Sequence, residues 1–338
     1  MRQAVMTQPG EIEFRDVEPP EPGPGQVLLR VKRIGICGSD VHVWHGRHPF
    51  TSYPVVQGHE FSAEVEAVGE GVEGVTPGSK ATARPQIVCG ECKACRSGDY
   101  NICYNLKVEG FQAPGCAQDL FVTDAEKLVV LPDDFTHEQG AMVEPCSVAV
   151  HATGRPGDVG GRNAVVLGAG TIGNLVSQMA RCRGANVLTT DVSDFRLDVA
   201  RQCGLEQTSN AAEESLSEAA ERVFGEDGYD LVFDCAGAEP AINQAIDNIN
   251  KGGTIVNVAL YEEKPRVPLS CVGEWQLTMI GSLMYLHEDY EQAVRRIGEG
   301  EVVTEPLDSK HFAFEDYEDA YRFIDEQGLE AMKVFMEL

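Results

Sequence analysis

A glycine turn between a buried strand and a helix is the feature that most constrains this chain. The apolar run Asn163-Ala164-Val165-Val166-Leu167 leads directly into Gly168-Ala169-Gly170-Thr171-Ile172-Gly173. In a Gly-x-Gly-x-x-Gly turn the first glycine allows a tight bend, the second lets the backbone approach a pyrophosphate, and the third lets helix and strand pack closely. A dinucleotide would therefore bind at Gly168, Gly170, Thr171, Ile172 and Gly173, where the expected helix points free N–H groups at the anion. By itself, the motif also fits a tight turn without a ligand.

Apolar runs and helical stretches alternate around this turn, as they do in a dinucleotide-binding domain. Six apolar runs alternate with helical stretches, at 163–168, 185–191, 205–208, 229–235, 253–260 and 277–283. This pattern predicts an α/β fold with a Rossmann, doubly wound parallel six-stranded sheet. Asp191 ends the second run, where a carboxylate accepts hydrogen bonds from the adenosine ribose and repels a 2′-phosphate, which favours NAD over NADP. Arg196 is a candidate to stack on adenine, and its alternative is a solvated helix residue.

The flanking regions have a different character. Residues 1–131 show short alternating strands separated by loops rich in glycine and proline, which predicts a β-rich region. Helical patterns begin near residue 138 and return near 288–299 and 316–327. The apolar residues between Met332 and Met336 predict a last strand.

Four cysteines lie close together in one segment: Cys89, Cys92, Cys95 and Cys103. Four thiolates complete a tetrahedral zinc site, so the segment predicts a closed, structural zinc. The alternatives are an iron–sulfur cluster, unliganded cysteines, or a zinc ribbon that binds nucleic acid. The chain has eleven cysteines in total, and this odd number in a long chain does not indicate a disulfide framework.

A second set of metal-ligand residues is spread along the sequence: Cys37, His59, Glu60 and Glu144. Three protein ligands and one open position are typical of a catalytic zinc. Spacing alone does not show that these side chains meet.

Composition limits the partners. The net charge of −27 argues against nucleic acid or an anionic membrane surface as a partner, because both are themselves negative. We find no run near the ~20 apolar residues of a membrane span and no signal peptide, so the cytoplasm is the expected location. The acid excess could also reflect a salt-rich habitat.

Several of these motifs together resemble one family. Gly-Ile-Cys-Gly-Ser-Asp-Val-His at 35–42, Gly-His-Glu at 58–60, the four-cysteine segment, Glu144-Pro145 and the glycine turn are similar to the zinc-dependent medium-chain alcohol dehydrogenases, sorbitol (L-iditol) dehydrogenase-like branch. The resemblance implies a GroES-like β-rich catalytic domain from residues 1–145 and 286–338, and a Rossmann NAD-binding domain from 146–285. It also implies two zinc ions per subunit, one catalytic and one structural, NAD as cofactor, and a homodimer or homotetramer.

The resemblance further implies a role for each catalytic residue. Cys37 and His59 would bind the catalytic zinc, while Glu60 and Glu144 are both candidates to ligate it, one directly and the other through water. Asp40 would orient His59. Ser39 and His42 would form a proton relay.

The implied reaction is the oxidation of a secondary alcohol, on a polyol, cyclitol or sugar-derived substrate, to a ketone. It would proceed through a zinc alkoxide and hydride transfer to NAD. The substrate segments depart from the polyol dehydrogenases, since Leu283-Met284-Tyr285 lacks their arginine. Two alternatives therefore stay open: a dehydrogenase of a small diol or amino alcohol, of the 2,3-butanediol or threonine type, and a non-catalytic NAD-binding redox sensor.

Overall fold

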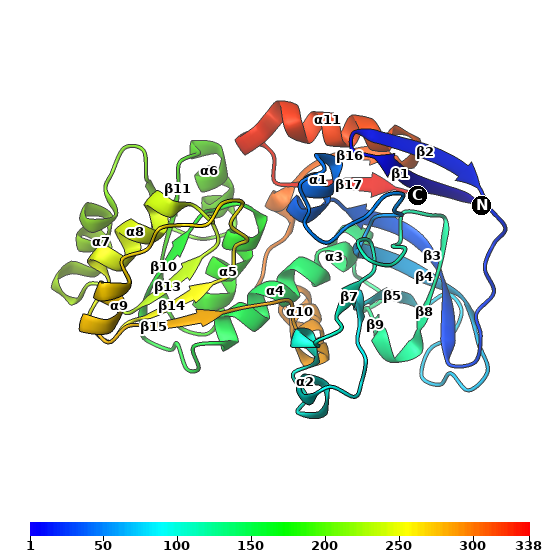
Figure 1. The fold of residues 1–338 in the computed structure, drawn as a ribbon, viewed down its shortest axis with the longest axis horizontal. Helices are drawn as coiled ribbons and strands as arrows, with labels where there is room; N and C mark the ends of the chain where they lie inside the picture. The colour runs from blue at the N-terminus through cyan, green and yellow to red at the C-terminus, as the bar shows by residue number, and fades with distance from the viewer. The chain divides into compact units, whose positions relative to one another are not determined.

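The protein folds into two compact units in a computed structural model that describes residues 1–338 (Figure 1). The first unit comprises Met1–Glu144, Leu286–Gly298 and Asp308–Leu338, and the second comprises Pro145–Tyr285 and Glu299–Leu307. No helix is long and apolar enough to cross a membrane.

The first unit is built on a seven-stranded sheet of order β16-β17-β3-β4-β5-β9, with β8 also paired to β3. Its strands are β3 (Gln26–Gly35), β4 (Glu60–Val68), β5 (Lys80–Ala83), β8 (Leu120–Asp124), β9 (Leu128–Val130), β16 (Asp308–Ala313) and β17 (Lys333–Glu337). Two strand pairs lie outside this sheet: β1 (Arg2–Gln8) with β2 (Glu11–Asp16), and β6 (Gln86–Ile87) with β7 (Lys107–Val108). Alternate residues of β3, Val27, Leu29 and Val31, enter the core, as the period of a strand requires.

The first unit also contains five helices. They are α1 (Gly38–Trp44), α2 (Lys93–Arg96), α3 (His137–Ala141), α10 (His287–Gly298) and α11 (Tyr317–Gln327), with one-turn 3₁₀ helices at Tyr100–Ile102, Ala125–Lys127, Phe314–Asp316 and Gly328–Glu330. Helix α4 (Val143–Gly154) begins at the end of the first unit.

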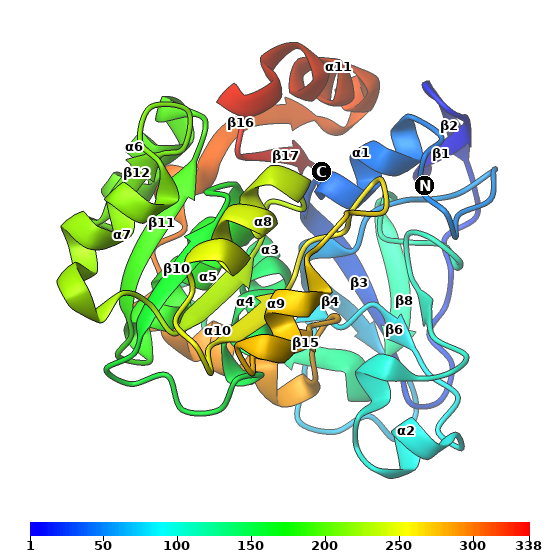
Figure 2. The ribbon, with the colours of Figure 1, turned by 60° about the vertical axis from the view of Figure 1, so that its left-hand side comes forward.

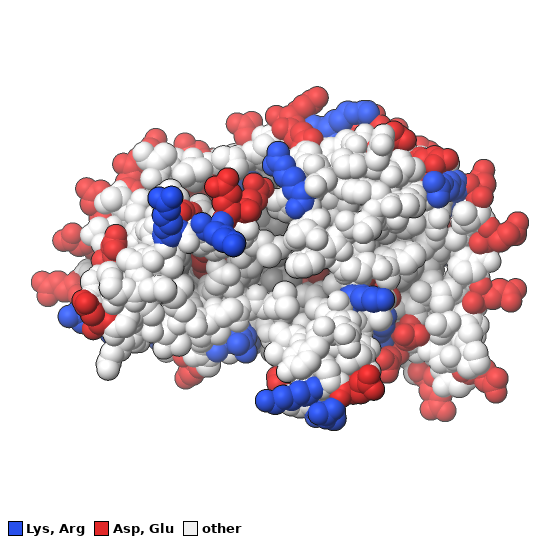
Figure 3. Space-filling view, in the orientation of Figure 1, with Lys and Arg blue, Asp and Glu red and all other residues white.

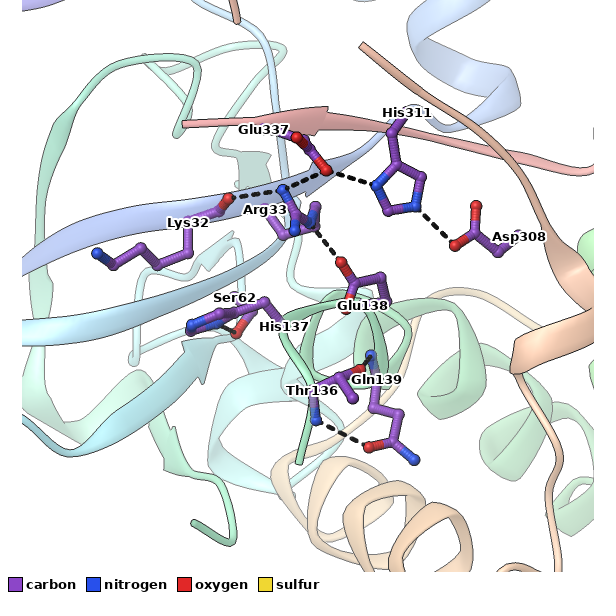
Figure 4. A network of polar contacts seen from close by, with 10 residues as sticks. All are labelled: Lys32, Arg33, Ser62, Thr136, His137, Glu138, Gln139, Asp308, His311 and Glu337. Atoms are coloured by element: carbon purple, nitrogen blue, oxygen red, sulfur yellow. Dashed lines mark hydrogen bonds and ion pairs between the residues drawn. The ribbon is translucent and has the colours of Figure 1, made fainter. Parts of the chain in front are cut away.

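Helix α3 is fixed to the sheet by polar side chains (Figure 4). Arg33 of β3 donates to Glu138 at 2.7 Å, and the Ser62 hydroxyl of β4 lies 2.9 Å from Nδ1 of His137. Gly140 packs so closely that a Cβ there would lie 2.6 Å from the Ser62 hydroxyl oxygen. These contacts fix the position of α3 on the sheet, and therefore the position of Val143, where α4 begins.

The second unit is a doubly wound parallel sheet of order β12-β11-β10-β13-β14-β15 (Figure 2). Its strands are β10 (Asn163–Leu167), β11 (Asn186–Asp191), β12 (Thr208–Asn210), β13 (Leu231–Asp234), β14 (Thr254–Asn257) and β15 (Thr278–Gly281). The helices between them are α5 (Thr171–Cys182), α6 (Asp194–Gln202), α7 (Leu216–Phe224), α8 (Glu239–Asn248) and α9 (Leu269–Glu274), with 3₁₀ turns at Gly225–Asp227 and Glu305–Leu307. The apolar faces of α7 and α8 pack on Val165, Val232 and Ile255.

The sheet of the second unit confirms the α/β fold class expected from the apolar runs. The third strand differs in position: it forms at Thr208–Asn210 rather than at 205–208. Leu205 does not belong to this strand. It lies at the end of the preceding helical turn, where its side chain is buried and its N–H donates to the carbonyl of Ala200.

One segment also lies in a different unit from the one expected. Residues 299–307 belong to the second unit, whereas the family resemblance implies that all of 286–338 belongs to the first. The reason is the buried amide of Gln178 on α5, which donates to the carbonyl of Val303 at 2.9 Å and accepts from its N–H at 2.7 Å. Two hydrogen bonds to one buried amide hold this segment on α5.

Candidate active site

Three of the predicted metal ligands meet in the first unit. The ligand atoms of Cys37, His59 and Glu60 lie within 4.8 Å of one another, and we refer to these three residues as the metal cluster. His59 and Glu60 are buried, and Cys37 is partly buried. They converge because Cys37 follows β3 and Glu60 begins β4, and these strands pair with Gly35 opposite Glu60.

The start of helix α1 orients the cluster. Cys37 is the N-cap of α1, and its N–H donates to the carboxylate of Asp40 at 3.0 Å. The other carboxylate oxygen of Asp40 lies 3.5 Å from Nδ1 of His59 and accepts from the Gln57 amide at 3.2 Å. Asp40 is 1% exposed, so it acts on His59 as a buried, fixed anion.

Electrostatics favour a cation at this place. Burial raises the pKa of the Cys37 thiol, and the neighbouring Glu60 raises it further, so a thiolate needs a positive partner. Burial alone would lower the pKa of His59, but Asp40 and Cys37 raise it well above the ordinary value. A thiol, an imidazole and a carboxylate are ligands that zinc accepts, so the residues fit a zinc ion.

Lys333 contacts the metal cluster and was not predicted from the sequence. Its ammonium group lies 2.5 Å from Oε2 of Glu60 and donates to the carbonyl of Ile36 at 3.1 Å. Both side chains of this ion pair are at least 96% buried. A lone lysine in the apolar run Met332–Met336 is the only sequence signal that could have found it.

The remaining candidates lie outside the metal cluster. Glu144 is 5% exposed in the first turn of α4 and lies outside the group of mutually close ligand atoms. It lies near enough to Lys333 to raise the pKa of that lysine, together with Glu60. Ser39 and His42 are three residues apart in α1, a spacing that places both on one face of a helix.

The four-cysteine segment forms the second candidate metal site. Each sulfur of Cys89, Cys92, Cys95 and Cys103 has a neighbour in the set at 3.5 Å, and two further sulfur pairs are 3.9 and 4.0 Å apart. Zinc–sulfur bonds of about 2.3 Å in a tetrahedron require sulfur atoms about 3.8 Å apart, so the cysteines fit zinc. A hydrogen bond from the backbone of Cys95 lowers the pKa of Cys92 to about 6, which favours the thiolate that a metal needs.

In the second unit, the glycine turn has the shape of a pyrophosphate cradle. Gly168 has φ +90°, and a Cβ on Gly173 would lie 1.9 Å from the carbonyl oxygen of Gly168, so neither position accepts a side chain. A Cβ on Gly170 would meet only the guanidinium of Arg196, at 3.6 Å. The open side of Gly170 and the start of α5 at Thr171 fit the phosphates of a dinucleotide.

Asp191 and Arg196 lie beside this turn. The carboxylate of Asp191 accepts from the N–H of Ala169 at 2.7 Å and from that of Ser193 at 2.9 Å. The guanidinium of Arg196 is 3.9 Å from the same carboxylate. The structure thus brings both predicted residues to the carboxyl edge of β11, next to the cradle.

Comparison with known proteins decides the family. Residues 23–133 match the model of the alcohol dehydrogenase GroES-like domain, and residues 171–299 match that of the zinc-binding dehydrogenases. The chain belongs to the zinc-dependent medium-chain alcohol dehydrogenase family. This dehydrogenase is therefore an oxidoreductase with a GroES-like and a Rossmann-type part, for which zinc and NAD are the expected cofactors.

The alignments with similar proteins cover nearly the whole chain. The dehydrogenase is 36% identical over 314 residues to a 2-dehydro-3-deoxy-L-galactonate 5-dehydrogenase of Pseudoalteromonas atlantica, covering 92% of each chain. It is 33% identical to a sorbitol dehydrogenase of Halalkalibacterium halodurans, covering 99% of each chain. Among solved structures, an Escherichia coli alcohol dehydrogenase complexed with NADH superposes with a TM-score of 0.91 at 28% identity, covering 100% of this chain and 99% of that one.

Proposed function

We propose that this dehydrogenase oxidises a secondary hydroxyl of a polyol or sugar acid to a ketone, with NAD as the oxidant. The observation that carries the proposal is the metal cluster, which offers three ligand atoms within 4.8 Å and leaves a tetrahedral ion one position for substrate. The similar galactonate and sorbitol dehydrogenases act on such substrates by name, which supports the substrate class.

Cys37, His59 and Glu60 would hold the catalytic zinc. We favour Glu60 over Glu144 as the direct carboxylate ligand, because the ligand atom of Glu60 lies within the cluster and that of Glu144 does not. When bound, zinc lowers the pKa of a coordinated hydroxyl toward neutrality. Asp40 keeps Nδ1 of His59 turned toward itself, which leaves Nε2 for the metal.

The proton of the substrate hydroxyl needs an exit. Ser39 and His42 share a face of α1, and we assign the proton transfer to this pair. Ser39 Oγ would accept the proton as its own hydroxyl proton moves on toward His42, and the His42 imidazole would release a proton to solvent. NAD, when bound, supplies the acceptor for the hydride that leaves the same carbon.

The second unit, and with it residues 146–285, would bind NAD. The Asp191 carboxylate supports NAD over NADP, since it would repel a 2′-phosphate and can hydrogen-bond ribose hydroxyls. Arg196, at the open side of Gly170, would contact the adenosine half.

Assembly and location are further parts of the proposal. Strand β15 ends the parallel sheet and has only β14 as a partner, and Met279 on this strand is 43% exposed. Unpaired apolar edges favour pairing with another chain, so we propose a homodimer or homotetramer that uses this edge.

The eleven cysteines are not paired in disulfides, which suits a reducing compartment such as the cytoplasm.

A screen of NAD reduction over polyols, cyclitols, sugar acids, 2,3-butanediol and threonine tests the substrate class. We expect turnover with a polyol or sugar acid, and its loss after treatment with a chelator. The Cys37→Ala variant should lose turnover but keep NADH affinity, while Cys271→Ala, which alters a cysteine of the second unit, should behave as wild type. Preference for butanediol or threonine would move the substrate to the diol and amino alcohol class, and NADH binding without any turnover would indicate a redox sensor.

A further inference from the structure

A completely buried carboxylate lies at the carboxyl edge of the sheet in the second unit. Asp234, the last residue of β13, has no exposed surface. Its Oδ1 accepts from the N–H groups of Ala236 at 3.2 Å and Gly237 at 3.1 Å, and its Oδ2 accepts from the hydroxyl of Tyr261. Burying an ionised carboxylate without hydrogen-bond donors costs free energy, so each of these three hydrogen bonds helps to stabilise Asp234 in the folded protein.

Asp234 joins the loops that follow two strands. Its side chain shapes its own turn, Cys235–Gly237, while its backbone carbonyl accepts from the N–H groups of Val258 and Ala259 after β14. The two loops touch, because a Cβ on Gly237 would lie 2.9 Å from the carbonyl oxygen of Leu260. Tyr261 therefore ties the end of the second loop back to the buried anion.

The same turn also contacts the glycine cradle. The N–H of Cys235 donates to Leu167 at 2.9 Å, and a Cβ on Gly168 would lie 3.1 Å from the nitrogen of Ala236. A change in the Asp234 turn would reach the cofactor site directly through this contact.

The strand order indicates which half of the cofactor these loops face. Strand β10 has β11 on one side and β13 on the other, and consecutive connections reverse direction there. A dinucleotide lies across the carboxyl edge at such a switch point. Since Asp191 marks β11 as the adenosine side, the nicotinamide half extends over β13 and β14.

We propose that Asp234 and Tyr261 are positioning residues for the nicotinamide half of NAD, acting through the 235–237 turn and the 258–261 loop. The inference rests on the proposed NAD-dependent function. Burial and the neighbouring Asp234 raise the pKa of Tyr261, so its hydroxyl stays protonated and remains a donor. No atom of either side chain needs to touch the cofactor for this role.

Binding measurements with two ligands test the proposal. NADH has a nicotinamide half and ADP-ribose lacks the nicotinamide ring, so the ratio of their dissociation constants isolates the ring. We expect Tyr261→Phe to raise the Kd of NADH about fivefold or more, while the Kd of ADP-ribose stays within about twofold of wild type. NADH binding can be followed by its fluorescence and ADP-ribose binding by calorimetry.

Tyr229→Phe is the matched control. Tyr229 precedes β13 at the opposite edge of the sheet, is fully buried, and donates its hydroxyl to the carbonyl of Ala245 at 3.1 Å. It should lower stability without changing either Kd. Equal weakening of both ligands in Tyr261→Phe, or no weakening of either, would overturn the positioning role; failure of the wild-type protein to bind NADH would instead overturn the proposed function on which it rests.

Discussion

At the scale of single residues, the metal cluster depends on a lysine from the far end of the chain. Lys333 neutralises Glu60 inside the protein, and the two side chains are separated by 273 positions in the sequence. A buried carboxylate that loses its only cation is strongly destabilising. A bound metal ion could take over part of the same electrostatic role.

Replacing Lys333 by methionine tests whether Lys333 and a bound metal ion share the role of neutralising Glu60. We expect Lys333→Met to lower the free energy of unfolding of the zinc-free protein by about 3 kcal/mol. Zinc should shrink the difference from wild type, because the metal then compensates the charge of Glu60. Thermal or urea unfolding with and without zinc measures both effects.

Lys32→Met is the matched control, since Lys32 lies 3.3 Å from Glu64 in a half-exposed pair of the same sheet. Its loss should cost less than about 1 kcal/mol, with or without zinc. If zinc leaves the deficit of Lys333→Met unchanged, Lys333 does not share its role with the metal.

A second buried pair makes stability depend on pH. Lys127 donates to Oε1 of Glu109 at 2.9 Å, while Oε2 of Glu109 has no partner. Burial raises the pKa of Glu109 from 4.5 to about 7, against the opposing effect of Lys127. Because the folded chain keeps this proton to higher pH, the stabilisation is complete below pH 4.5 and is lost as the pH rises through about 7.

The Glu109→Gln, Lys127→Met double variant removes this titration without leaving an unpaired charge. The free energy of unfolding of the wild type, measured relative to the variant, should fall by roughly 3 kcal/mol between about pH 4.5 and 7. Urea unfolding across this range provides the measurement. A constant difference would show that Glu109 is ionised throughout.

At the scale of elements, the cysteine segment has little regular secondary structure. It contains one helix of four residues and one 3₁₀ turn, and Ile102 and the adjacent Tyr104 are exposed. Tyr100 is its main anchor: Arg84 lies 5.0 Å above its ring, and its hydroxyl accepts from the N–H of His287 at 2.5 Å. Four thiolates without a metal would repel one another.

Cys103→Ser should therefore unfold this segment locally. We expect loss of one of two zinc ions and cleavage between residues 89 and 103 in limited proteolysis, with the Kd of NADH unchanged because the glycine turn lies in the second unit. Cys271→Ser should keep both metal ions. A segment that resists protease after losing its zinc would contradict this expectation.

Features fixed by local spacing could be predicted from the sequence, whereas those that depend on contacts between distant elements could not. Local patterns sufficed for the cysteine segment and for the strand and glycine turn at 163–173, because spacing along the chain fixes their geometry. Glu60 and Glu144 could not be ranked, since their distances from Cys37 depend on how strands β3 and β4 pair with each other and how α3 packs on them. Lys333 and Tyr261 were missed for the same reason: their partners are distant in sequence.

At the scale of the whole molecule, acidic side chains line much of the margin of the face shown in Figure 3, with basic side chains among them. The net charge is −27, so like charges repel across the folded chain. Salt screens this repulsion over about 8–10 Å at physiological concentration and more strongly above it.

We expect the midpoint of urea unfolding to rise as sodium chloride increases from low to molar concentration. Sucrose stabilises proteins without screening charge, so a series at matched osmolality separates the two effects. A midpoint that is flat or falls with salt, while rising with sucrose, would show that charge repulsion contributes little to stability.

The place of β17 in its sheet has a consequence for how the protein is made. Strand β17 comes last in chain order among the strands of this sheet but lies between β16 and β3, so the sheet of the first unit cannot close until residues 333–337 have been made. Residues 145–285, by contrast, are complete much earlier and contain all six strands of their own sheet. Lys333 arrives with β17, so a nascent or truncated chain has every ligand of the metal cluster but lacks the cation that neutralises Glu60.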